Sequence, residues 1–126
     1  MNKKVLVADD DVIALNMLKS ALSEAGYEVI ATSSGTEAVM LAKEHPPFVV
    51  ILDINMPGMD GTEVADALKK DQKTKDIPVI FLSSMISPNE ERFIADKGSV
   101  SLMAKPYSRD RLLNEVRKHF LRNSQK

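Results

Sequence analysis

Five short apolar runs, each followed by a longer amphipathic stretch, form the pattern that most limits how this chain can fold. The runs are rich in β-branched residues and cover Val5–Ala8, Tyr27–Thr32, Phe48–Leu52, Val79–Leu82 and Val100–Met103. Apolar residues at helical spacing follow them at 11–25, 35–44, 60–70, 88–96 and 108–122. Strands that alternate with helices predict βα units, and hence a parallel sheet with helices on both faces.

Local signals support several of these helix boundaries. A capping residue followed three positions later by glutamate occurs at Ser34–Glu37, Asp60–Glu63 and Ser87–Glu90. Pro88 falls at the first helical position, where proline is favoured. Gly26 lies where the first helix should end.

The third run, Phe48–Leu52, is apolar at every position, which is typical of a central strand buried on both faces. A chain of 126 residues is long enough for one domain with a hydrophobic core, but too short for a closed eight-stranded α/β barrel. No glycine-rich phosphate loop follows the first strand. We therefore expect one domain over residues 1–126: a doubly wound, flavodoxin-like α/β fold with five parallel strands in the order 2-1-3-4-5.

Composition excludes several classes of function. The net charge is −1, so no general affinity for nucleic acid or for an anionic membrane is expected. The chain has no cysteine, which rules out disulfides, a thiolate nucleophile and any cysteine-bound metal. The apolar stretch after the first two lysines is only Val5–Ala8, too short for a signal peptide or a membrane span. A cytoplasmic location is the default expectation.

Polar side chains gather where the predicted strands end. They are Asp9, Asp10 and Asp11 after the first run, Asp53 after the third, Ser83 and Ser84 after the fourth, and Lys105 after the fifth. Because functional groups collect at the carboxyl ends of parallel strands, we expect these four segments to meet at one edge of the sheet.

Several carboxylates in one cleft repel each other and favour a cation between them. Oxygen ligands without histidine or cysteine suit Mg²⁺, or the similar Mn²⁺. Asp9 and Asp10 are the better candidates for ligands, since one side chain is enough to cap the following helix. For Asp11, a cap and a role at the site are equally plausible.

Asp53 follows a buried strand and precedes the turn signal Pro57-Gly58, which should leave its carboxylate exposed at the strand tip. There it could act as a nucleophile that forms an acyl phosphate, with a metal to shield the negative charges. Ser83 could donate its hydroxyl to a phosphoryl oxygen, and Lys105 could pair with the anion.

This spacing resembles that of the receiver domain of two-component response regulators, over essentially the whole chain. The matching residues are Asp9-Asp10, Asp53 within the Asp53–Gly61 segment, Ser83 thirty residues later, and Lys105-Pro106 twenty-two residues beyond Ser83. The resemblance implies that Asp53 accepts a phosphoryl group from a phosphohistidine on a sensor kinase or a histidine phosphotransferase. It also implies a signalling domain, not an enzyme, that acts through phosphorylation-dependent contacts with other proteins.

The resemblance further assigns roles at the metal. Asp10, Asp53 and the backbone carbonyl of Asn55 would bind Mg²⁺ directly, and Asp9 would act mainly through metal-bound water. Ser83 would be the switch hydroxyl, with Lys105 as the ionic partner of the phosphoryl group. A cis peptide before Pro106 and a target surface on the fourth helix, the fifth strand and the fifth helix are also implied.

Two positions depart from the usual pattern of receivers. Leu102 stands three residues before the lysine, where receivers often have a tyrosine or phenylalanine that swings inward. The coupling must then run through the loop after Ser83 and the fourth helix. Ser84 follows the switch hydroxyl where alanine or glycine is common, which leaves less room for the phosphoryl group.

The first helix carries more apolar residues than a core-facing stripe needs. The predicted core stripe consists of Ala14, Met17, Leu18, Ala21, Leu22 and Ala25. Val12, Ile13 and Leu15 are left over near the acidic site, and we expect Ile13 and Leu15 to contact the partner that carries the donor histidine. The seven methionines are expected to fill the core, and His45 and His119 are expected to have no functional role.

Two other functions share part of this pattern. A haloacid-dehalogenase-type phosphatase also uses an aspartate nucleophile with Mg²⁺, but it needs a second aspartate where this chain has Asn55. A flavodoxin-type electron carrier is disfavoured, because the phosphate-binding loop and a tryptophan to flank the flavin are missing. Only a short polar tail follows the last predicted helix in this sequence, and we expect either a stand-alone receiver or a receiver cut from a larger regulator.

Overall fold

A computed structural model describes residues 2–84 and 100–124. Their elements follow the predicted alternation: β1 (Lys4–Ala8), α1 (Val12–Glu24), β2 (Glu28–Thr32), α2 (Gly35–Glu44), β3 (Val49–Asp53), α3 (Gly61–Lys69), β4 (Val79–Ser83), β5 (Val100–Ala104) and α5 (Arg109–Ser124). The helix expected at 88–96, with its start signal at Ser87–Glu90, lies outside the described residues.

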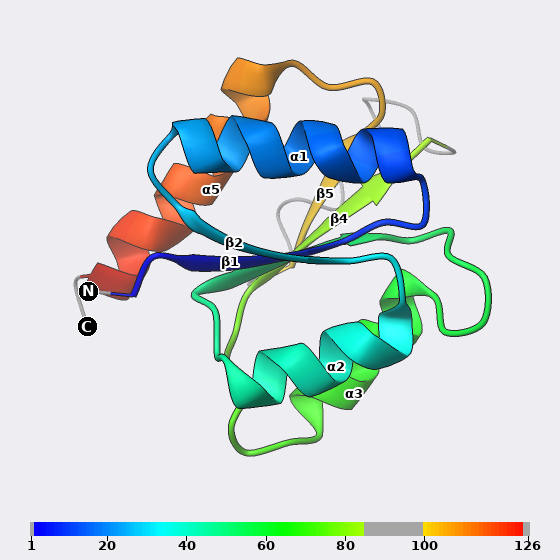
Figure 1. Cartoon of the computed structure of the whole chain (residues 1–126). Coiled ribbons are helices and arrows are strands. Elements are labelled where there is room, and N and C mark those ends of the chain that lie inside the picture. Colours follow the sequence, from blue (N-terminus) through cyan, green and yellow to red (C-terminus); the bar gives the residue numbers. More distant parts are fainter. Residues whose placement is uncertain (1, 85–99, 125–126) are drawn as a thin grey trace.

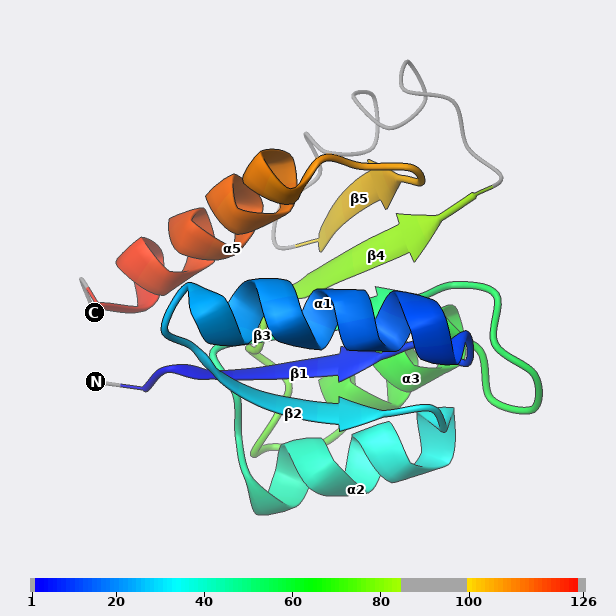
Figure 2. The ribbon, with the colours of Figure 1, turned by 45° about the horizontal axis from the view of Figure 1, so that its top comes forward.

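The five strands form one parallel sheet in the order β2-β1-β3-β4-β5, as predicted. Figure 1 shows α1 and α5 on one face of the sheet and α2 and α3 on the other. In the turned view of Figure 2, β1 and β2 run alongside α1 with α2 beneath them. This is the doubly wound, flavodoxin-like arrangement that the sequence indicated.

Alternation along the strands divides the core into two layers. Val5 and Val7 of β1 pack with Leu22 of α1 and with α5, whereas Leu6 and Ala8 face α2 and α3. β3 is buried along its whole length, as expected for the strand at the centre of the sheet. Each large aliphatic side chain removed from water here contributes roughly 1.5–3 kcal/mol to stability.

The predicted helix caps are present in the described helices. Asp60 and Glu63 form a complete capping box at α3, with Asp60 Oδ1 accepting from Glu63 N at 3.0 Å and Glu63 Oε1 accepting from Asp60 N at 3.2 Å. Ser34 accepts a hydrogen bond from the amide of Glu37 at the start of α2. Gly26 has a φ of 97°, the left-handed conformation that ends α1.

The predicted inward face of α1 is partly wrong. Met17 was assigned to the core, yet it is 67% exposed, and Ala25 is exposed too. Leu15, assigned to the exposed surface, packs instead against the core cluster under α1. The true core stripe is narrower, because Leu15, Leu18 and Leu22 follow helical spacing and already fill the space above the sheet.

The expectation that the methionines fill the core also fails for two of them. Met17 and Met40 are more than half exposed, whereas Met56 and Met103 are buried. Met1 and Met85 lie outside the described residues. Leu102 is buried on β5, as expected for a strand residue that packs on the sheet.

Candidate phosphoacceptor site at the carboxyl edge of the sheet

β3, β4 and β5 each extend one residue further than predicted at this edge, so that two site residues belong to the ladder itself. Asp53 is the last residue of β3 and pairs with Leu82, and Ser83 is the last residue of β4 and pairs with Ala104. The amide of Ile54 donates to the Leu82 carbonyl at 3.0 Å. The backbone around Asp53 is therefore held on its β4 side by hydrogen bonds of the sheet.

Asp9 follows β1 and is completely buried. Its amide donates to the Thr32 carbonyl at 3.2 Å, which holds the chain against the end of β2. Its Oδ1 accepts from the amide of Asp11 at 3.0 Å, and its Oδ2 accepts from Lys105 Nζ at 3.0 Å. Both carboxylate oxygens of Asp9 are thus held in place.

Lys105 links the two ends of the site. Its amide donates to the Ser83 carbonyl at 2.8 Å and fixes the chain directly after β5. Its ammonium lies 3.0 Å from Asp9 Oδ2 and 3.6 Å from Asp53 Oδ2. The peptide between Lys105 and Pro106 is cis, as the resemblance implied.

The charges around Asp53 oppose its ionisation. Burial raises the pKa of the Asp53 carboxyl, and the nearby charge of Asp9 raises it further. Lys105 and the amide of Asn55, which donates to Asp53 Oδ1 at 3.2 Å, lower this pKa but do not offset the increase. One cation is therefore too little to balance the carboxylates of this cleft.

Lys105 is held in its charged form. Burial lowers the pKa of its ammonium, but the hydrogen bond and charge of Asp9, together with Asp53, outweigh burial and raise this pKa. The ammonium therefore stays protonated at neutral pH and can act as a fixed positive charge beside Asp53.

Three carboxylates come close enough to hold a small ion. Oxygen atoms of Asp9, Asp10 and Asp53 all lie within 4.8 Å of one another, and Asp10 is exposed while the other two are buried. The expectation of an exposed Asp53 is therefore wrong, since this side chain lies among the neighbouring strand ends and is only 6% exposed. An all-oxygen set with one side open to solvent fits a hard cation that keeps some of its waters. The donor set present thus fits Mg²⁺ or Mn²⁺.

Asp11 has a different role from its two neighbours. Its Oδ1 accepts hydrogen bonds from the amides of Ile13 at 3.0 Å and Ala14 at 3.3 Å, so it caps the first turn of α1. This resolves the alternative left open by the sequence, because the carboxylate is committed to the helix.

A glycine that the sequence did not single out lies directly against the backbone of Asp53. A Cβ at Gly61 would stand 2.6 Å from the Asp53 carbonyl oxygen and 3.0 Å from Ile54 Cα. Only glycine permits α3 to begin so close to the end of β3. In the sequence, the Asp60-Gly61 pair after the Pro57-Gly58 turn was the feature that could have indicated this need for glycine.

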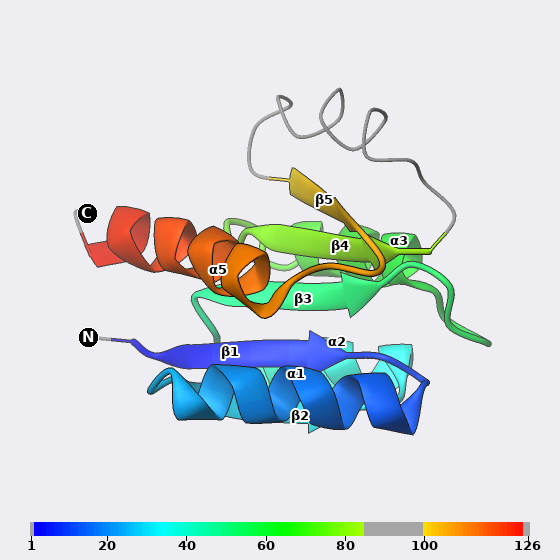
Figure 3. The same cartoon turned by 90° about the horizontal axis from the view of Figure 1, so that it is seen from above.

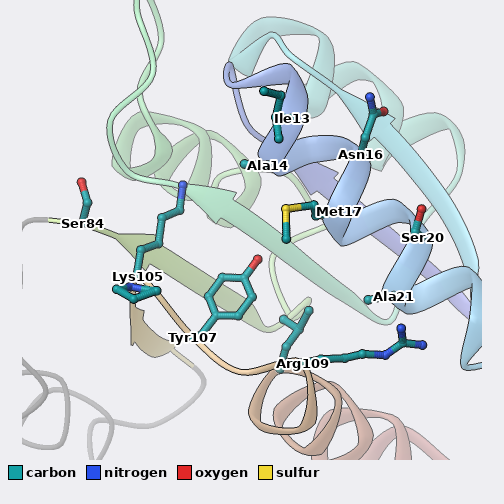
Figure 4. Close-up of a pocket in the computed structure, with 12 residues that line it drawn as sticks. Ile13, Ala14, Asn16, Met17, Ser20, Ala21, Ser84, Lys105, Tyr107 and Arg109 are labelled. Carbon is teal, nitrogen blue, oxygen red and sulfur yellow. The ribbon is translucent and has the colours of Figure 1, made fainter.

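Tyr107 is a second residue that the sequence left aside. It follows Lys105-Pro106 and lines a cavity of about 830 Å³ between α1 and the start of α5. Figure 4 shows its side chain standing between Lys105 and Met17, with Ser84 on the far side of Lys105. Burial raises the pKa of Tyr107 to about 12, with a further contribution from Asp9, so its hydroxyl stays neutral.

The chain can now be compared with known protein families. The family model described as the response regulator receiver domain matches residues 5–117. That range includes every residue of the site described above. The chain belongs to the response regulator receiver family.

The relatives of this receiver are themselves response regulators. The polar-differentiation response regulator DivK of Brucella ovis is 32% identical over 119 residues, which cover 94% of this chain and 97% of DivK. Among solved structures, the chemotaxis protein CheY4 of Vibrio cholerae is 30% identical, with a TM-score of 0.81 over 94% of this chain and 98% of that one. The Francisella response regulator 1452 receiver domain is 32% identical, with a TM-score of 0.83 over 97% and 99% of the two chains.

These matches identify the chain as a signalling domain of two-component systems, and they give no support to the phosphatase alternative. Within the described residues, none of the helices is both long and apolar enough to cross a membrane. His45 is exposed at the end of α2, whereas His119 is buried.

Proposed function

We propose that Asp53 of this receiver accepts a phosphoryl group from a phosphohistidine on a sensor kinase or a histidine phosphotransferase. The observation that supports this role is the position of the Asp53 carboxylate, which ends the central strand beside both an acidic pair and the Lys105 ammonium. The proposal extends to the whole chain, residues 1–126, as one receiver domain.

In the proposed reaction, a carboxylate oxygen of Asp53 attacks the phosphorus atom. The new O–P bond forms as the N–P bond of the phosphohistidine breaks, and the imidazole leaves with the electron pair and takes a proton from solvent. The amide of Asn55 holds Asp53 Oδ1, and the strand ladder holds the backbone, so the nucleophile is oriented before the donor arrives.

The carboxylates of Asp10 and Asp53 and the backbone carbonyl of Asn55 are the proposed direct ligands of Mg²⁺ or Mn²⁺, with Asp9 acting through water. The bound ion would neutralise the charge of the phosphoryl oxygens and of the cleft. Asp9 has a further task, since its Oδ2 keeps the Lys105 ammonium in the site.

Lys105 and Ser83 are the proposed partners of the acyl phosphate. The Lys105 ammonium already lies 3.6 Å from Asp53 Oδ2, within reach of a phosphoryl oxygen attached there. Ser83 is buried at the tip of the neighbouring strand, and its hydroxyl is proposed to move toward the phosphoryl group. The state of the domain would then be transmitted through the loop after Ser83, because Leu102 cannot supply the usual aromatic movement.

A pair of neighbouring aspartates gives a sharp test. Asparagine keeps the cap of α1, so Asp11→Asn should fold and accept a phosphoryl group from acetyl phosphate and Mg²⁺ at the wild-type rate. Asp10→Asn removes a proposed ligand and should slow the reaction at least tenfold at limiting Mg²⁺. The extent of labelling is read by intact mass, with one phosphoryl group per chain expected. Equal rates in the two variants would refute the metal assignment, and continuous release of phosphate from assorted esters would favour a phosphatase.

The partner surface is proposed to lie on the outer side of α1. Leu15 no longer qualifies, because it packs into the core, but Val12, Ile13 and Met17 are 63%, 74% and 67% exposed. Ile13 and Met17 are one helical turn apart and both line the cavity beside Lys105. An apolar ridge next to the acceptor is suited to the helical bundle that presents a donor histidine.

This surface can be tested with two double variants of the same chemistry. Ile13→Ser with Met17→Ser should slow transfer from a histidine phosphotransferase at least tenfold but leave labelling by acetyl phosphate unchanged. The control pairs Met40→Ser with Leu121→Ser, which are also exposed but lie on α2 and α5. If both double variants slowed transfer equally, the ridge on α1 would not be the docking surface.

The downstream target is proposed to bind the face formed by the fourth helix, β5 and α5.

A further inference from the structure

Two methionines within residues 2–84 and 100–124 are more than half exposed, and they lie on opposite faces of the sheet. Met17 on α1 is 67% exposed, and Met40 on α2 is 55% exposed. Figure 3 views the sheet from the side of α1, with α2 behind it. The two thioethers therefore have similar access to solvent but border different surfaces of the molecule.

The Met17 sulfur lies beside the proposed phosphoacceptor site. Met17 lines the cavity of about 830 Å³ together with Ile13, Lys105 and Tyr107. In Figure 4 its sulfur points away from α1, toward the side of the cavity where Lys105 and Tyr107 lie. Because Met17 also belongs to the proposed docking ridge on α1, this sulfur faces solvent in the free chain and would be covered by the phosphodonor in the proposed complex.

An exposed thioether is a group that a peroxide can oxidise. The sulfur lone pair attacks one oxygen of hydrogen peroxide, and an S–O bond forms as the O–O bond breaks. The released hydroxide takes the proton from the transferred oxygen and becomes water, so the sulfur is oxidised by two electrons and the peroxide is reduced. Met56 and Met103 are only 6% and 1% exposed, and the core shields them from this reaction.

Oxidation changes the chemistry of the docking ridge. The thioether of Met17 is apolar and packs well against other apolar side chains, whereas a sulfoxide is polar and accepts hydrogen bonds. Docking would strip water from the sulfoxide oxygen, and a buried acceptor without a partner opposes binding. The phosphoacceptor site itself consists of carboxylates, a hydroxyl and an ammonium, which hydrogen peroxide leaves unchanged.

We propose that oxidation of Met17 by a peroxide switches off transfer from the histidine phosphodonor and leaves the reaction at Asp53 intact. This inference rests on the docking surface proposed above and adds a redox control to it. Reduction of the sulfoxide by a methionine sulfoxide reductase restores the apolar ridge and hence docking.

The test compares transfer before and after treatment with hydrogen peroxide. The full chain is oxidised, freed of peroxide and mixed with a phosphorylated histidine phosphotransferase that labels the untreated chain. Peptide mass spectrometry gives the fraction of sulfoxide at each methionine. As sulfoxide accumulates at Met17, transfer should slow roughly fivefold or more, while labelling by acetyl phosphate and Mg²⁺ keeps its rate. A methionine sulfoxide reductase should then restore transfer.

Two leucine variants identify the responsible sulfur, and each is compared with its own untreated rate. Met17→Leu has no thioether on the ridge, so peroxide should no longer slow transfer to it. Met40→Leu loses a similarly exposed thioether on the other face of the sheet, so peroxide should slow its transfer as much as in the wild type. The proposal is overturned if Met17 oxidises no faster than Met56, if peroxide slows Met17→Leu like the wild type, or if the oxidised wild type keeps its untreated rate.

Met17→Ser separates this proposal from the docking surface on which it rests. Without peroxide, transfer to this variant should be slow, because serine removes an apolar contact of the ridge. If Met17→Ser is slow but the oxidised wild type transfers normally, the redox control is wrong and the docking surface stands. If Met17→Ser transfers at the wild-type rate, Met17 is not a docking residue and both proposals fall.

Discussion

At the scale of single residues, the main feature of the site is an excess of negative charge: one ammonium group lies among several carboxylates. Lys105 is shared between Asp9 and Asp53, and Asp11 is withdrawn from the cluster because it caps α1. Asp9 and Asp53 are both buried, which raises the cost of leaving their charges unbalanced. The residue-level arrangement therefore favours the binding of one further cation.

The close contact at Gly61 gives a prediction at this scale. In Gly61→Ala, the new Cβ would meet the Asp53 carbonyl at 2.6 Å, so the backbone of Asp53 must move. We expect a loss of roughly 1–3 kcal/mol in the free energy of unfolding and a labelling rate by acetyl phosphate at least fivefold slower. Urea denaturation and intact mass measure the two effects.

Gly26→Ala is the matched control. Gly26 has a positive φ, but a Cβ added there would meet no atom within 4 Å, and the residue lies after α1, away from the site. The variant should lose about 1 kcal/mol of stability through backbone strain and keep the wild-type labelling rate. A slow rate in both variants would mean that lost stability, not the position of Asp53, limits the reaction.

At the scale of the elements, the two helices on one face of the sheet serve different ends of the molecule. The start of α1 borders the proposed phosphoacceptor site and presents Ile13 and Met17 to solvent. In the last turns of α5, His119 is buried near the amino-terminal ends of the strands. Glu24 and Arg109, at the far end of α1 and the start of α5, form an ion pair that joins the two helices.

His119 predicts how the stability of α5 and the domain depends on pH. Because burial lowers its pKa in the folded protein below the ordinary 6.5, the unfolded chain takes up a proton that the folded chain does not. The free energy of unfolding should therefore fall as the pH drops below about 6.5, by at most about 1.4 kcal/mol per pH unit from this group.

Urea denaturation of His119→Leu between neutral pH and mildly acidic pH tests this dependence. The variant should lose the part of the slope that His119 causes, whereas His45→Leu, which changes an exposed histidine at the end of α2, should retain it. A wild-type slope in His119→Leu would contradict the burial of a neutral imidazole.

At the scale of the whole molecule, the fold could be predicted well from the sequence. The parallel sheet followed from the alternation of apolar runs and helical stretches, because each run had the length and composition of a buried parallel strand. The order of the strands followed from the missing glycine-rich loop after the first run, which favoured the flavodoxin-like arrangement. The ends of β3 and β4 were placed one residue early, since Asp53 and Ser83 are polar and composition alone cannot show that they belong to the ladder.

The inward faces of the helices were harder to predict than the sheet. Met17 and Leu15 have similar hydrophobicity, and only the direction in which α1 approaches the sheet decides which one is buried. The same applies to His119, whose burial depends on how the last turns of α5 lie over the residues before β3 and β4. Such packing directions are set by the whole structure and leave little trace in the local sequence.

The repulsion among the carboxylates also predicts that a divalent cation stabilises the whole domain. Mg²⁺ at a hundredfold excess over its dissociation constant should add about 2.7 kcal/mol to the free energy of unfolding and raise the melting temperature. Asp10→Asn should lose most of this gain, and Asp11→Asn should keep it. An equal gain from Na⁺ at matched ionic strength would indicate general screening instead of a specific site.

The central claim, that Asp53 is the phosphoacceptor, is tested most directly by locating the phosphoryl group. After labelling with acetyl phosphate and Mg²⁺, borohydride converts an aspartyl phosphate to homoserine, and peptide mass spectrometry identifies the reduced residue. We predict homoserine at position 53 and no labelling of Asp53→Asn. Reduction at Asp9 or Asp10 instead, or full labelling of Asp53→Asn, would contradict the claim.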